Sequence, residues 1–256
     1  MIAFCAFVRK EIVELIRNKR LIILLAIFTI FAILGPLTAV LTPWILETMS
    51  DLLESSGVTV NGITITVLDS WTQYYKNLPI LLIVFVLMFA GLFTKEYARG
   101  TFELIISKGM SRNKIYFAKM LTVLGTWTIC YIAYFLISLA YNVSLWDNRV
   151  AQHWGIAAFL YWIFGVYVII GMVSVSGFSA SVSGVLIGTG VFAVMPELIG
   201  ILPKITKYMP TQLTSGILIL TGSIKPNDRI ESIVVTAILC FVAGGIGAKG
   251  FSKKQL

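Results

Sequence analysis

The sequence predicts an all-α polytopic membrane protein with six transmembrane helices, an N-terminal interfacial amphipathic helix and a short cytoplasmic helix between spans 2 and 3. Of its 256 residues, 58% are hydrophobic and 12% are charged, about half the charged share of soluble domains. Hydrophobic runs of about 20 residues, the length of a membrane-crossing helix, recur along the whole chain. We therefore treat residues 1–256 as a single transmembrane domain.

Residues 1–20 are expected to form the interfacial helix that precedes the first span. Apolar and polar side chains alternate there at helical spacing, which is typical of an amphipathic helix. The apolar side carries Phe4, Phe7, Val8, Ile12, Leu15 and Ile16. The basic side, with candidate residues Arg9, Lys10, Glu14 and Arg17, would face anionic lipid at the inner interface. A plain membrane anchor is the alternative.

Six spans follow, and each must be helical because backbone groups in lipid have to pair internally. The second is short, and the pattern leaves its start open. The spans cover residues 21–41, 78–93, 115–141, 156–176, 182–202 and 230–248.

Lysine and arginine are unequally distributed between the two sides of these spans. Fourteen fall at the termini and in residues 94–119, and six fall in the alternate loops. The positive-inside rule therefore places both termini and the 94–119 segment in the cytoplasm. Because topology explains the net charge of +8, the basic residues do not indicate nucleic acid.

The outer loop 42–77 is expected to carry some structure of its own. Residues 43–54 can form a short acidic helix. The stretch VTVNGITIT at 58–66 alternates around Asn61-Gly62, a strong hairpin signal. Nothing in the sequence assigns a role to this hairpin.

Several motifs point away from bond chemistry. The G-x-G-x-x-G at Gly245, Gly247 and Gly250 ends a membrane span, whereas a dinucleotide site needs a preceding strand. No P-loop sequence occurs. The single histidine and the three cysteines show no metal-ligand spacing. We therefore expect a non-enzymatic chain without its own ATP site, metal or cofactor.

Ionisable residues inside the spans are rare, which argues against a proton pathway. Lys119, Glu197 and Glu231 are expected near the interfaces, where long side chains reach water cheaply. The interior offers hydroxyls instead. These suit either an amphiphilic substrate path or ordinary helix packing, at Thr122, Thr126, Tyr131 and Tyr134.

The charged segment 94–114 interrupts two hydrophobic runs. Gly100 frees the chain, residues 101–108 can form two helical turns, and Gly109 is a natural stop. Ser111 can then cap the third spanning helix. An exposed face that mixes Phe102 with Glu103 is typical of a protein-docking surface. A basic loop that only sets topology is the alternative.

This segment resembles the ABC-2 type permease family, the membrane subunits of ATP-binding-cassette exporters. The similar residues are Glu96, Gly100, Thr101, Ser111, Arg112 and Lys119. Further stretches resemble the family in the same order: FVRKEIVELIRNKRLIILL, GPLTAVLTP and KYMPTQLTSG. Together they cover nearly the whole chain.

The resemblance implies that residues 101–108 are a coupling helix that docks on a separate ATPase subunit. ATP and Mg²⁺ would be bound there, by two ATPase copies serving two permease chains. The resemblance also implies that residues 196–229 partly re-enter the membrane from outside. We expect Glu96 and Arg112 to fix the coupling element by an ion pair or a helix-end interaction. The ATPase-coupling residues would be Glu96, Gly100, Thr101, Phe102, Glu103 and Arg112.

The expected function is ATP-driven export of an amphiphilic cargo across the plasma membrane. Peptides such as a bacteriocin or toxin, antibiotics and lipids all fit an uncharged path, and so does a role in antibiotic resistance or self-immunity. The alternative is an ion-coupled secondary transporter or channel. The residues do not choose the cargo, the ATPase, or between two identical permeases and two related ones.

Overall fold

The computed structural model describes residues 2–48, 65–98, 100, 102, 106–107 and 109–253, and the regular elements in these ranges are all helical. Six helices are long and apolar enough to cross a membrane, which confirms the predicted all-α fold with six spans. They are α2 (Arg20–Thr48), α4 (Val67–Phe89), α7 (Arg112–Leu145), α8 (Trp154–Phe178), α9 (Val182–Ile199) and α11 (Ile230–Lys253). The shorter elements are α1 (Ile2–Arg17), α5 (Thr94–Ala98), η1 (Asn148–Val150), η2 (Thr206–Tyr208), η3 (Pro210–Thr214), α10 (Gly216–Leu220) and η4 (Pro226–Arg229).

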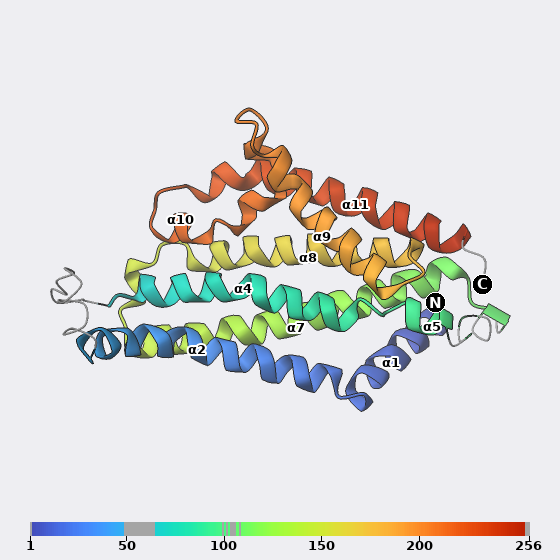
Figure 1. Cartoon of the computed structure of the whole chain (residues 1–256), viewed down its shortest axis with the longest axis horizontal. Helices are drawn as coiled ribbons and strands as arrows, with labels where there is room; N and C mark the ends of the chain where they lie inside the picture. Colours follow the sequence, from blue (N-terminus) through green and yellow to red (C-terminus); the bar gives the residue numbers. More distant parts are fainter. Residues whose placement is uncertain are drawn as a thin grey trace.

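The spanning helices form one elongated bundle (Figure 1). α2, α4, α7 and α8 run along its long axis, with α2 packed on α4 and α7, and α8 packed on α9 and α11. Both chain termini, α1 and α5 lie at one end, which we name the proximal end; α10 lies toward the other, distal end (Figure 1). Termini that share an end agree with an even number of spans.

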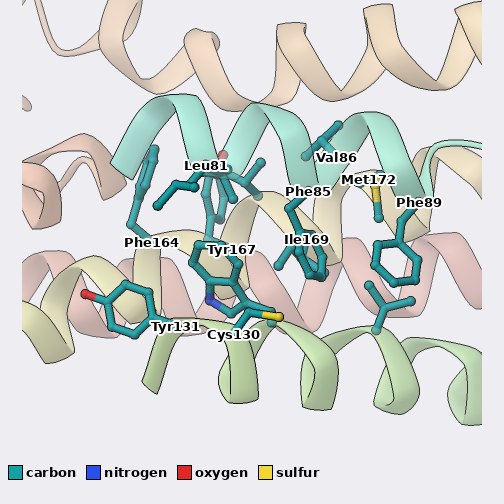
Figure 2. Close-up of a cluster of buried hydrophobic side chains, with 14 of the residues drawn as sticks. Leu81, Phe85, Val86, Phe89, Cys130, Tyr131, Phe164, Tyr167, Ile169 and Met172 are labelled. Carbon is teal, nitrogen blue, oxygen red and sulfur yellow. The ribbon is translucent and has the colours of Figure 1, made fainter. Parts of the chain in front are cut away.

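The core lies where α4, α7 and α8 face one another (Figure 2). Aromatic and aliphatic side chains of α4 and α8 meet there. Among them are Phe85, Phe89, Ile169 and Met172, which are fully buried. Close packing is possible because Gly165 of α8 has no side chain: a Cβ there would lie 2.2 Å from the Trp127 ring of α7. α4, α7 and α8 are therefore closely packed against one another in this core.

The second span begins earlier than the sequence predicts, because α4 starts at Val67 instead of residue 78. The Asp69 carboxylate accepts hydrogen bonds from the Thr66 amide at 2.8 Å and the Thr66 hydroxyl at 2.9 Å, which fixes this start. The first turns of α4 contain polar residues, so the hydrophobicity pattern did not indicate a spanning helix there. Among them, Ser70 faces inward and donates to Asn142 at 2.6 Å.

The first span is also longer than predicted. α2 continues through Pro36 and Pro43 to Thr48, so residues 43–48 extend the span and do not begin a separate acidic helix. Residues 49–64 lie outside the described part, and they hold the rest of that predicted helix and most of the predicted hairpin at 58–66.

The segment between α9 and α11 folds back against the bundle. η3 and α10 pack on α8, and α10 also packs on α4. Leu213, Ile219 and Leu220 are buried by these contacts. Gly216 permits the approach, because a Cβ at this position would lie 2.3 Å from the Tyr75 ring.

Candidate functional site

The candidate site is a buried charged cluster at the proximal end, and its centre is Lys119 of α7. The Lys119 ammonium donates to Glu11 Oε2 of α1 at 2.8 Å and to Glu96 Oε1 of α5 at 2.6 Å. The side chain of Lys119 is 1% exposed, that of Glu11 8% and that of Glu96 15%. One ammonium thus joins three helices that are far apart in the sequence.

The position of Lys119 differs from the sequence expectation. The lysine was expected to extend toward water from the start of the third span, but it points inward and satisfies its charge with two carboxylates. Sequence reasoning also missed Glu11. A signal was present, since Glu11 follows Phe7 by one helical turn and so shares its inward face; both residues are buried.

A second lysine continues the cluster toward the surface of α1. Lys10 forms ion pairs of 3.0 Å with both Glu11 and Glu14. Partial burial opposes the charged form of Lys10 and of Glu14. Burial is the largest single influence, but their mutual hydrogen bond and the attraction of nearby opposite charges together outweigh it, so the pKa of Glu14 is lowered and the pKa of Lys10 is raised.

Oxygens of Glu11, Glu14 and Glu96 lie within 4.8 Å of one another, which is close enough for three carboxylates to bind one metal ion. Lys10 and Lys119 already supply two positive charges between them. The arrangement therefore serves to join helices, and it leaves one net negative charge.

Phe102 of the predicted coupling helix is anchored beside this cluster. Its ring centroid lies 4.9 Å from Tyr97, 5.4 Å from Phe251 of α11 and 6.1 Å from Phe93. Phe102 is 0% exposed, so the prediction that it belongs to an exposed docking face is wrong. The physical reason is that the ring removes a large apolar area from water by packing on these neighbours.

The turns that border the coupling segment match the sequence expectation. Gly100 and Gly109 adopt φ values of +64° and +86°, a region that favours glycine. Ser111 precedes the first residue of α7 as predicted, although its side chain makes no capping hydrogen bond. Thr101 and Glu103 lie outside the described residues.

The predicted ion pair between Glu96 and Arg112 is replaced by a different arrangement. The described ion pair of Glu96 is with Lys119. Arg112 Nη1 donates instead to the Ser252 carbonyl at 2.9 Å, which ties the start of α7 to the end of α11. Glu96 and Arg112 thus make separate contacts, and that of Arg112 is a helix-end interaction with α11.

The polar side of α1 faces away from the bundle. Arg9, Lys10 and Arg17 are exposed, and Glu14 is half-buried. Ile12 and Ile16 of the predicted apolar stripe are not covered by the rest of the described chain either. The stripe is divided in the structure: Phe7 faces α7, whereas the two isoleucines remain on the outer surface.

The four residues predicted as a substrate path lie in the interior. Thr122, Thr126, Tyr131 and Tyr134 are all buried. Both threonine hydroxyls donate to carbonyls one turn earlier in α7, and both tyrosine hydroxyls donate to backbone carbonyls of neighbouring helices. In this structure the two tyrosines join α7 to α8 and α4, whereas the two threonines bond within α7, an arrangement that fits the alternative interpretation of ordinary helix packing.

The sequence of this chain matches a known protein family. A family model described as ABC-2 family transporter protein matches residues 5–232, most of the chain. The chain belongs to the ABC-2 transporter family. No curated protein matches it.

Membership gives the cluster its context. An ABC-2 permease is a multi-pass membrane subunit that works with a separate ATPase subunit and has no ATP site of its own. The matched range includes α1, α5 and the start of α7, which are the three elements that Lys119 joins.

Proposed function

We propose that this ABC-2 permease exports an amphiphilic cargo, driven by ATP hydrolysis on two partner subunits that dock at the proximal end. The observation that carries the proposal is the buried Glu11–Lys119–Glu96 cluster. It connects the segment expected to receive the ATPase with the interfacial helix and a spanning helix. The proximal end would face the cytoplasm, in line with its basic residues.

Movement of the coupling segment would reach three parts of the permease at once. Lys119 links α5 to α7 and α1, and the rings around Phe102 link the segment to α11. A densely packed interior does not deform continuously, so the helices would shift as rigid bodies between two packed states. Such a shift at the interface of two permease copies would alternate the access of the cargo.

The cargo could be a peptide such as a bacteriocin or toxin, an antibiotic or a lipid. Roles in antibiotic resistance or self-immunity follow from this chemistry, and so does a dimer of identical or related permeases. An ion-coupled mechanism has less support. Lys119, a buried lysine of a spanning helix, is already paired with two carboxylates, which favours a structural role for its charge over ion transport.

Cysteine crosslinking tests the docking. Ser107 is exposed in the coupling segment, so Ser107→Cys would be placed in a chain whose exposed native cysteine is removed by Cys5→Ser. With the partner ATPase present, we expect a crosslink whose yield changes with ATP and vanadate. Ser223→Cys, exposed near the distal end, is the matched control and should form no crosslink to the ATPase.

Two results would contradict the proposal. Equal crosslinking from Ser107→Cys and Ser223→Cys would show that the contact is unspecific. A permease that purifies without any ATPase and still transports would support the ion-coupled alternative.

A further inference from the structure

A groove of about 560 Å³ opens on the side of the bundle between α4, α8 and α9. This volume is within the range of known ligand sites, which are mostly apolar with a few polar groups. The walls follow that description, with aliphatic and aromatic residues such as Leu82, Val86, Phe164 and Leu186. Glu197, near the end of α9, is the charged residue among those that line it.

Glu197 lies two residues before the end of α9 and is exposed. α9 has 18 residues and so is about 27 Å long, which is shorter than the roughly 30 Å hydrocarbon core of a bilayer. The helix is also tilted against α8, and its C-terminal end does not reach the distal end of α8 (Figure 1). Glu197 therefore lies near the end of a short spanning helix, where its side chain lines the groove and remains exposed.

The charge of Glu197 has no ion-pair partner in the described part of the chain. The glutamates that do form ion pairs in this part of the chain are bound by Lys10, Lys119 or Lys207. The C-terminal end of α9 adds its own partial negative charge through the last carbonyl groups. An apolar groove with concentrated negative potential at one end is complementary to a cation that carries an apolar tail.

We propose that this groove binds a free amphiphile of net positive charge, with its cationic head on Glu197 and its tail along α4 and α8. This assignment names a cargo class for the proposed export function. It rests on that function, because a bound amphiphile is a cargo only if the chain exports it. Ordinary zwitterionic lipids fit less well, because their phosphate would approach the same carboxylate that attracts their ammonium group.

Binding to the full chain alone tests this assignment. The chain would be placed in phosphatidylcholine nanodiscs and titrated with a fluorescent alkylammonium probe. An alkyl sulfate and an alkyl alcohol of the same tail and label would be the matched probes, and empty nanodiscs would define the partition background. We expect the ammonium probe to bind above background and the sulfate probe not to bind.

Three variants separate charge from shape. Glu197→Gln should weaken binding of the ammonium probe about tenfold or more, the effect of losing one charge-assisted contact, and should leave the alcohol probe unchanged. Gly190→Phe should reduce binding of both probes, because Gly190 lines the groove and a Cβ there meets nothing within 4 Å, so the ring fills the groove without disturbing the helix. Glu231→Gln is the control, since Glu231 pairs with Lys207 outside the groove.

Equal affinity of the ammonium probe for the Glu197→Gln variant and the unaltered chain would overturn the inference. Saturation of the groove by phosphatidylcholine, seen as no specific binding of any probe, would overturn it too. The experiment contains no ATPase, so its failure leaves the docking proposal intact. A failed crosslink at Ser107→Cys would likewise leave this binding result standing.

Discussion

Replacing Lys119 with methionine is expected to loosen the proximal end and to uncouple the permease. Loss of one partner of a buried ion pair typically costs 3–5 kcal/mol because a charge is left uncompensated. Here Glu11 keeps the Lys10 ammonium at 3.0 Å, whereas the described ion pair of Glu96 is lost entirely. We therefore expect the lower end of this range, about 3 kcal/mol in the free energy of unfolding.

The assay is reversible chemical unfolding of the full chain in lipid micelles, followed by tryptophan fluorescence. Lys119→Arg, which keeps the charge, should recover most of the loss. Replacement of all three residues by Lys119→Met, Glu11→Leu and Glu96→Leu should also recover stability, because no buried charge remains. ATPase stimulation should return with the arginine but not with the apolar triple variant, if the ion pairs transmit motion.

A loss below about 1 kcal/mol for Lys119→Met would refute this reasoning, since that is the value of an exposed ion pair. It would mean that water reaches the cluster and that the three helices are held by other contacts.

Two further substitutions test the packing on which the account depends. Phe102→Ala should cost about 3–5 kcal/mol, because it removes a fully buried ring, and should also reduce ATPase binding measured by co-purification; unchanged binding would mean that the ring does not position the segment. Gly177→Val should cost about 1–3 kcal/mol in the same unfolding assay, because a Cβ there lies 2.7 Å from the Gly247 carbonyl oxygen of α11, and Gly125→Ala, with nothing within 4 Å, should be near neutral.

The sequence was a sound guide to features that depend on long averages. Six hydrophobic runs correspond to the six spanning helices, since each run is itself the requirement for crossing a bilayer. Gly100 and Gly109 were also identified correctly, because a positive φ follows from local chemistry. Family membership was predictable for a related reason: it was carried by several short motifs in a fixed order.

Features that depend on a distant partner were not predictable. Nothing near Lys119 in the sequence shows that Glu11, 108 residues away, will bind it. The exposure of Phe102 was misjudged because its neighbour Phe251 comes from the last helix. The start of α4 was missed for the same reason, since Ser70 is satisfied by Asn142 on another helix. Hydrophobicity patterns indicate which residues are excluded from water, but they do not indicate which polar residues will contact one another in the fold.

Transport by reconstituted permease and ATPase tests the central claim most directly. Inside-out proteoliposomes would be supplied with a labelled cationic amphiphile, with ATP, and with either active or hydrolysis-deficient ATPase. We predict uptake that requires active ATPase, persists when ionophores collapse ion gradients, and disappears in the Lys119→Met variant. Uptake that continues with the deficient ATPase and stops on addition of ionophore would contradict it.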